Sequence, residues 1–224
     1  MSEFGYSLFQ PYIDLKYRDF CIPIVNTKKI VLGVRSGDMK KITKDIAKKY
    51  DSSILDSLDF TYFEETNLYF NLLPFYFKGA EVINKAINKI GEIDSWGTTD
   101  GFVSSSKFVK KDLDFYFPIF MNLLESKNQW GVRLALVFFL IYYPTYPKID
   151  EVIKVSLKHN YQEYYIVMAE AWFFSFLYMK NKSVIMPYLE KGLIKGNLLK
   201  YFIRKCLDSY RVSEEDKEEL RKYQ

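Results

Sequence analysis

The stretch that decides the fold runs from Tyr164 to Lys180 and reads YYIVMAEAWFFSFLYMK. It contains no proline or glycine, and apolar side chains recur in it at intervals of three and four residues, which is the period of an α-helix. These side chains are Tyr165, Met168, Ala169, Trp172, Phe176 and Met179. We therefore predict a helix over residues 162–180 that packs this stripe against its neighbours.

The same period extends outward along the chain. Residues 112–125 and 129–142 predict one pair of antiparallel helices, and residues 148–159 and 162–180 predict the next. No linker rich in glycine, serine or proline divides the chain. Pairs that recur every ~35 to 45 residues predict an all-α fold, an α-α superhelix of HEAT-like repeats. We expect a single domain over residues 1–224, with a compact helical bundle as the alternative.

Helix-start signals sharpen some of these boundaries. Residues 36–38 (Ser-Gly-Asp) can cap a helix that begins near Met39, and residues 51–53 can start the next one. Ser213, followed three residues later by Asp216, resembles a capping box before the charged last helix.

Composition excludes several classes of protein. Hydrophobic residues make up 49% of the chain and aromatic residues 18%, which excludes a disordered chain. The best apolar run, residues 135–143, is about half the ~20 residues of a membrane helix, so we expect no membrane partner. We see no signal peptide, and Cys21 and Cys206 stand alone without metal-ligand spacing. We expect a cytoplasmic monomer.

The net charge of +4 permits a polyanionic partner without requiring one. A lysine cluster taken alone is more often a solvated helix face than a binding site. The lysines gather in three clusters: Lys40, Lys41, Lys44, Lys48 and Lys49; Lys107, Lys110 and Lys111; and Lys191, Lys195, Lys200 and Lys205.

The sequence lacks the residues that several kinds of catalytic and binding site require. Residues 33–38 (GVRSGD) have too few glycines for a phosphate-binding loop. His159 is the only histidine, which nearly excludes histidine-based general-base catalysis and histidine-rich metal sites. It falls where a helix should end and is interpreted as structural. We expect no cofactor and no metal.

A few residues are unusual for their positions. Trp96 and Asp100 are four residues apart and would share one helix face. Arg133 interrupts the apolar helix that starts at Trp130, so it must be paired or face a cleft. Taken one at a time, a core role for each tryptophan (Trp96, Trp130 and Trp172) and a buried structural ion pair for Arg133 are the more common interpretations.

Together, the order and spacing of these segments carry a resemblance that spans nearly the whole chain. The chain resembles the AlkD-like DNA alkylation repair proteins, which are HEAT-like-repeat DNA glycosylases. The segments that carry the likeness are Gly33-Val34-Arg35, Tyr62-Phe63-Glu64-Glu65, Ser95-Trp96-Gly97-Thr98-Thr99-Asp100, Trp130-Gly131-Val132-Arg133, residues 164–172 (YYIVMAEAW) and residues 205–213 (KCLDSYRVS).

The resemblance implies a reaction and a site. Members of that family remove cationic alkylpurines such as 3-methyladenine and 7-methylguanine from duplex DNA. A cleft lined by a tryptophan, an aspartate four residues later, an arginine and a second tryptophan receives the damaged nucleotide. Those positions match Trp96, Asp100, Arg133 and Trp172. The implied DNA contacts are Arg133 together with Lys40, Lys41, Lys107 and Lys110.

Two differences from the family's pattern leave a second hypothesis open. Gly97 stands where the repair enzymes often have a second acidic residue, and it weakens the helix preference by ~1 kcal/mol. The N-terminal region has room for two short helices, around residues 4–10 and 14–21, before an expected extended segment, residues 22–25. Its few basic residues are Lys16, Arg18, Lys28 and Lys29. The alternative to a glycosylase is therefore a non-catalytic HEAT-like paralogue that binds DNA weakly.

Overall fold

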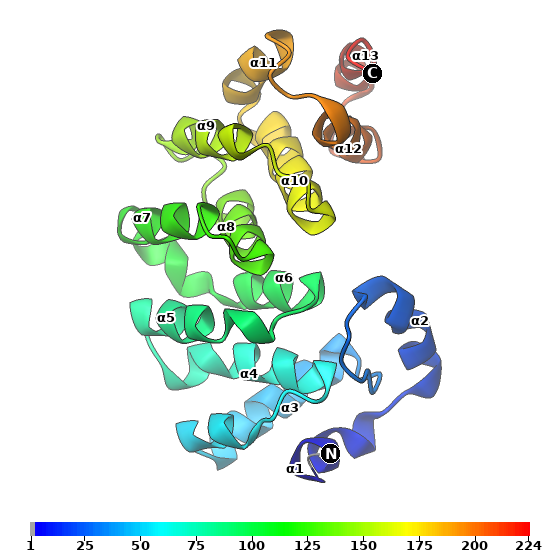
Figure 1. Cartoon of the computed structure of the whole chain (residues 1–224), viewed down its shortest axis with the longest axis vertical. Coiled ribbons are helices and arrows are strands. Elements are labelled where there is room, and N and C mark those ends of the chain that lie inside the picture. Colours follow the sequence, from blue (N-terminus) through cyan, green and yellow to red (C-terminus); the bar gives the residue numbers. More distant parts are fainter. Residues whose placement is uncertain (1–2) are drawn as a thin grey trace. The chain divides into compact units, whose positions relative to one another are not determined.

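The structure, a computed structural model, describes residues 3–224, and these residues form thirteen α-helices and four short 3-10 helices (Figure 1). The predicted all-α fold class is confirmed. Contacts between Cα atoms divide the chain into two compact units, residues 1–108 and residues 109–224. A single domain over both units stays a prediction. Within residues 3–224, no helix has the length and apolar character needed to cross a membrane.

The first unit is built around one buried helix, α4. The helices of this unit are α1 (Glu3–Phe9), α2 (Leu15–Val25), α3 (Ser36–Lys49), α4 (Phe63–Tyr76), α5 (Ala80–Asn88) and α6 (Trp96–Ser105), with 3-10 turns η1 (Gln10–Tyr12), η2 (Ser52–Ser57) and η3 (Ile90–Glu92). Helix α4 packs against α3, α5 and α6. The rings of Phe70 on α4 and Phe102 on α6 meet edge to face, with centroids 5.7 Å apart. Both side chains are fully buried, so this contact fixes α6 on the core.

The second unit has two central helices, α8 and α10. The last 3-10 turn, η4 (Lys107–Lys111), leads into α7 (Leu113–Leu124), α8 (Gln129–Tyr142), α9 (Ile149–His159), α10 (Tyr164–Lys180), α11 (Lys182–Glu190), α12 (Gly196–Leu207) and α13 (Glu214–Arg221). Helix α8 packs against α7 and α10, and α10 packs against α11 and α12. The rings of Phe120 on α7 and Phe138 on α8 stack with centroids 4.0 Å apart. Such helix-on-helix stacking is the expected arrangement, and the predicted helices 112–125, 129–142, 148–159 and 162–180 all form within about two residues of their bounds.

The apolar stripe predicted to pack α10 against its neighbours is not the side of the helix that faces the core. The side chains of Tyr165, Met168, Trp172, Phe176 and Met179 are only half-buried, although Ala169 is buried. The core side of α10 is formed instead by Ile166, Val167, Phe173, Phe174 and Leu177. Because α10 is apolar on nearly all sides, periodicity alone could not tell which side faces the core.

Two boundaries also differ from the predictions. Residues 22–25 were expected to be extended, but α2 continues through Pro23 to Val25. A proline in the last turn removes one helical donor only, and Asn26, in the left-handed conformation, ends the helix. Helix α3 begins at Ser36, three residues before Met39, and Arg35 at its N-cap makes no side-chain cap hydrogen bond.

Other local predictions hold. Asp51 accepts a hydrogen bond from the Ser53 backbone N–H at 2.9 Å, although the turn that follows is a 3-10 helix. The Ser213 hydroxyl accepts from the Asp216 backbone N–H at 3.1 Å and caps α13. His159 is the last residue of α9, where a polar side chain suits the helix end.

Candidate functional site

Three side chains at and just before the start of α6 bind the end of α2 and the residues that follow it. The Ser95 hydroxyl donates to the carbonyl oxygen of Val25 at 2.6 Å. The Trp96 indole N–H donates to the carbonyl oxygen of Ile24 at 2.9 Å. Asp94 accepts from the Thr27 hydroxyl at 2.7 Å and from the Lys28 backbone N–H at 2.8 Å. The last carbonyls of α2 are thus satisfied by side chains at the start of α6.

Asp100 lies one helical turn after Trp96 on α6, as the spacing predicts. Its side chain is half-buried, and Oδ1 lies 2.9 Å from the Thr99 hydroxyl oxygen. The neighbouring Thr98 hydroxyl donates to Asn67 Oδ1 on α4 at 2.6 Å. Polar contacts with α2 and α4 therefore hold the helix that carries Trp96 and Asp100.

Packing explains why position 97 is a glycine, and the sequence alone does not reveal this. A Cβ atom added at this position would lie 3.3 Å from the ring edge of Phe63 on α4. That distance is tighter than an ordinary carbon–carbon contact, so any larger side chain would have to displace the Phe63 ring. The glycine therefore allows the first turn of α6 to approach α4 closely.

The loop before α3 is organised by a buried carboxylate. Glu64 on α4 accepts backbone N–H hydrogen bonds from Leu32, Gly33 and Val34 at 2.8 to 3.3 Å. Gly33 has a φ of +91°, and a Cβ there would lie 2.5 Å from the Asp14 carbonyl oxygen. This arrangement fixes the start of α2 and the start of α3 to one point of the core.

In the second unit, Arg133 is buried in the contact between α8 and α10. Its side chain is 5% exposed, and Nη1 donates to the carbonyl oxygen of Tyr165 at 2.9 Å. The Tyr165 ring in turn packs on Trp130, with centroids 5.1 Å apart. Arg133 was expected to be paired or to face a cleft, and the Tyr165 backbone carbonyl is one partner that it has.

Trp172 belongs to the half-buried stripe of α10. Its indole ring meets Phe176 edge to face at 6.1 Å, and Lys205 Nζ from α12 lies 5.9 Å from the ring centroid. A cation at this distance from an indole face is within the range of cation–π attraction. The Trp172 ring is therefore partly accessible, and a cation already lies beside it.

The four lysines predicted to bind DNA are all exposed. Lys40 and Lys41 lie on α3, where Lys41 Nζ is 5.7 Å from the centroid of the Tyr12 ring. Lys107 and Lys110 lie in η4, and Lys110 Nζ is 5.8 Å from the Tyr142 ring.

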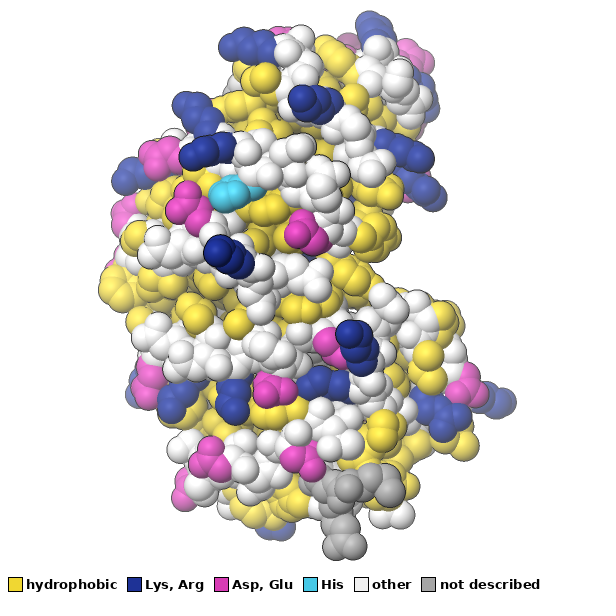
Figure 2. Space-filling model, in the orientation of Figure 1, with side chains coloured by type: hydrophobic (Ala, Val, Ile, Leu, Met, Phe, Trp, Pro, Cys, Tyr) yellow, Lys and Arg dark blue, Asp and Glu magenta, His cyan; other side chains and the backbone are white. Residues whose placement is uncertain are grey.

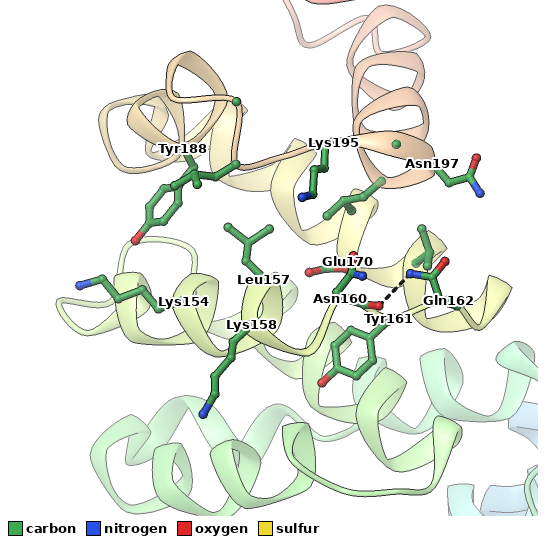
Figure 3. Close-up of a pocket in the computed structure, with 15 residues that line it drawn as sticks. Lys154, Leu157, Lys158, Asn160, Tyr161, Gln162, Glu170, Tyr188, Lys195 and Asn197 are labelled. Carbon is green, nitrogen blue, oxygen red and sulfur yellow. Dashed lines mark hydrogen bonds between the residues drawn. The ribbon is translucent and has the colours of Figure 1, made fainter.

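A cavity of about 750 Å³ in the second unit was not predicted. It lies among α9, α10 and the start of α12, and Figure 3 shows Lys195 and Glu170 reaching into it from different elements. Glu170 is 2% exposed and accepts a hydrogen bond from the Ser156 hydroxyl. Burial raises the pKa of Glu170 to about 7. In the sequence, Glu170 is a single carboxylate within the apolar residues of α10, and this is the feature that could have identified it.

The structure brings some of the predicted residues together and leaves others in different units. Trp96 and Asp100 share one helix of the first unit, and Arg133 and Trp172 lie on the adjacent helices α8 and α10 of the second. The meeting of all four in one cleft stays a prediction. Asp94 and Ser95 were not recognised as the anchor of α6, although a serine directly before a helix is a cap signal.

Comparison with known proteins supplies the family. A search of curated proteins gives no match for this chain. The model of the family described as DNA alkylation repair enzyme matches residues 9–204, a span that includes α2, α6, α8 and α10. Because the match extends over most of the 224 residues, the chain belongs to the DNA alkylation repair enzyme family.

Proposed function

We propose that this protein hydrolyses the N-glycosidic bond of purines alkylated at N3 or N7 in duplex DNA. The family supports a role in alkylation repair, and the resemblance to AlkD-like proteins supports this reaction. Water attacks C1′ of the deoxyribose, the bond from C1′ to purine N9 breaks, and its electron pair stays on the purine. The cationic purine leaves as a neutral base, so its departure needs no general acid. The products are the free alkylpurine, an abasic site and a proton.

The residues of this chain have complementary roles in that reaction. Bond cleavage develops positive charge on the sugar, which the Asp100 carboxylate would stabilise while it positions the attacking water. The faces of Trp96 and Trp172 would attract the same charge by cation–π interaction, worth ~0.5 to 2 kcal/mol each. Because the Arg133 side chain is buried, its guanidinium is better placed to orient a carboxylate than to bind an exposed phosphate.

One observation carries the proposal. Trp96 and Asp100 lie one turn apart on a helix that is held from α2 by the bond to Ile24 and from α4 by the bond between Thr98 and Asn67. Both functional side chains remain half-buried rather than sealed in the core. A rigid helix that presents a carboxylate and an indole together suits electrostatic stabilisation, because such groups then need no reorganisation during the reaction.

The test is an excision assay on methylated duplex DNA. The wild-type protein should release 3-methyladenine or 7-methylguanine, and Asp100→Asn should reduce the rate by at least a hundredfold. Asp45→Asn is the matched control, because Asp45 is exposed on α3 of the same unit. Equal rates for the wild type and Asp100→Asn would contradict the proposed role of Asp100.

The second candidate function is weak DNA binding without catalysis. The N-terminal region favours it, because the exposed side of α2 includes apolar residues such as Phe20 and Ile24, and Arg18 on this helix is paired with Asp19. Gly97 supports it less than the sequence suggested, because the close approach to Phe63 accounts for the glycine. No release of alkylpurine with enzyme in excess, together with measurable duplex binding, would establish this alternative.

A further inference from the structure

The buried hydroxyl of Thr99 lies between the two candidate catalytic residues of α6. Thr99 is 0% exposed, and its hydroxyl oxygen is 2.9 Å from the Trp96 carbonyl oxygen and 2.9 Å from Asp100 Oδ1. One side chain therefore contacts both residues that the proposed reaction uses in this unit.

A threonine hydroxyl has one hydrogen to donate, and here two acceptors compete for it. A hydrogen bond to an ionised carboxylate is about twice as strong as one between neutral groups. In the regular pattern of an α-helix, the Trp96 carbonyl oxygen also accepts the backbone N–H of Asp100, so it keeps a partner without the hydroxyl. With Asp100 ionised, as the proposed reaction requires, the Thr99 hydroxyl therefore donates to Oδ1.

The Thr99 hydroxyl is itself held in place. Threonine is β-branched, which restricts the rotation of its side chain in a helix, and the core encloses Thr99 fully. The preceding Thr98 donates to Asn67 on α4 at 2.6 Å, so this turn of α6 is fixed to the core of its unit. Thr99 is thus a donor whose position is set before any ligand arrives.

The Asp100 side chain, by contrast, is only half-buried. The terminal torsion of an aspartate has a broad distribution, so a partly exposed carboxylate takes a range of orientations unless a hydrogen bond selects one. Electrostatic stabilisation of a transition state depends on groups that already point at the developing charge. A fixed donor at Oδ1 supplies such an orientation from within α6.

The general charge of the protein does not replace a well-oriented carboxylate. The chain has a net charge of +4, and acidic and basic side chains are interspersed on the side of the first unit that Figure 2 shows. A positive net charge disfavours a cation. Attraction of a cationic sugar therefore has to come from individual groups such as Asp100.

We propose that Thr99 is a positioning residue for Asp100, whose hydroxyl holds the carboxylate in the orientation that stabilises the cationic sugar. This inference rests on the proposed function in assigning that task to Asp100. Thr99 acts through the carboxylate and does not touch the DNA, because its own side chain is fully buried.

The test compares two duplexes that contain a stable replacement for the damaged nucleoside. In one, the sugar is a pyrrolidine whose amine is protonated at neutral pH and imitates the developing charge; in the other, it is a neutral tetrahydrofuran. The wild type should bind the cationic duplex more tightly, and the ratio of the two dissociation constants measures this charge preference. Thr99→Val keeps the shape of the side chain without the hydroxyl, and it should lower the ratio about fivefold. Affinity for the neutral duplex should stay within about twofold of the wild type.

Three further variants separate positioning from a general effect on folding. Thr99→Ser retains the hydroxyl and should keep the ratio within about twofold of the wild type. Thr43→Val is the matched control, because it removes a threonine hydroxyl that is 3% exposed and bonds the Met39 carbonyl at 2.7 Å on α3 of the same unit. It should leave the ratio unchanged. In an Asp100→Ala background, Thr99→Val should have no further effect on the ratio, because the hydroxyl then has no carboxylate to orient.

An unchanged ratio in Thr99→Val would overturn the inference. So would an equal decrease in Thr43→Val, or a further decrease when Thr99→Val is added to Asp100→Ala, because the hydroxyl would then act only through the stability of the fold.

The outcomes also separate this inference from the proposed function. A charge preference that is the same in the wild type and Thr99→Val would remove only the inference. A charge preference that depends on Thr99, without any release of alkylpurine, would remove only the catalytic proposal. A wild type that does not prefer the cationic duplex would overturn the role of Asp100 and the inference with it.

Discussion

The indole N–H of Trp96 donates a hydrogen bond to the carbonyl oxygen of Ile24, 72 residues earlier in the chain and 2.9 Å away. This bond joins the candidate catalytic helix α6 to the last turn of α2. It has two consequences. The Trp96 ring is held in one orientation at the start of α6, and the C-terminal end of α2 gains a donor for a carbonyl that no residue of its own helix satisfies.

Ser95 is central to the same connection, and its replacement by alanine should be destabilising. The change removes the side-chain cap of α6. It also leaves the buried Val25 carbonyl oxygen without its hydrogen-bond donor. We expect a loss of about 2 kcal/mol in the free energy of unfolding, measured by denaturant titration. Ser104→Ala on the same helix is the control, because the exposed Ser104 hydroxyl bonds only within α6, and the expected change is within about 0.5 kcal/mol.

The carboxylate of Glu64 supports the other end of α2 and the start of α3. In Glu64→Gln, one of the two side-chain oxygens becomes an NH₂ group that cannot accept from the backbone N–H groups of residues 32–34. We expect a loss of about 2 kcal/mol and faster amide hydrogen exchange at these residues. Glu81→Gln, at an exposed position of α5, should change neither quantity. Unchanged exchange in Glu64→Gln would show that the loop is held by other contacts.

Local periodicity predicted most of the fold, and contacts between distant residues account for what it missed. The helices α7 to α10 were found because their patterns of apolar residues and turns are local. The last turn of α2 was missed because Pro23 argues against a helix, whereas the donors that satisfy this turn come from Ser95 and Trp96. Apolar residues on nearly all sides of α10 hid its core-facing side from a periodicity argument.

The candidate site was predicted unevenly for the same reason. Trp96 and Asp100 were placed on one helix face by their spacing, which is a local property. The buried position of Arg133 was expected from the apolar residues around it, but its acceptor, the Tyr165 carbonyl, lies on another helix. The roles of Asp94 and Glu64 depend on backbone groups far away in the sequence, which no pattern of single residues reveals.

Lysines on α3 should contribute to DNA binding through phosphate contacts. Lys40→Ala is expected to weaken duplex binding equally for different base sequences and to reduce the salt slope by about 0.9, the value for one phosphate contact. Lys154→Ala is the control, because Lys154 is already paired with Asp150 at 2.6 Å in the second unit. A salt slope that is the same in Lys40→Ala and the wild type would exclude Lys40 from the interface.

Glu170 should make the stability of the protein depend on pH. Burial raises its pKa in the folded chain to about 7, above the ordinary value of 4.5. Between these two values the folded chain keeps a proton that the unfolded chain has released, so the free energy of unfolding falls as pH rises from about 4.5 to about 7 and then levels off. The shift corresponds to about 3 kcal/mol.

Glu170→Gln should remove this part of the pH dependence, because the amide has no proton to lose and its oxygen can still accept from the Ser156 hydroxyl. The variant should therefore be more stable than the wild type at pH 8 and similar to it at pH 4.5, as measured by urea unfolding at both values. Glu65, whose pKa burial also raises to about 7, contributes a decrease of the same sign that Glu170→Gln leaves in place. The double variant with Glu65→Gln should accordingly show a flatter profile than either single variant, and parallel profiles for the wild type and Glu170→Gln would mean that Glu170 is ionised in the folded chain at neutral pH.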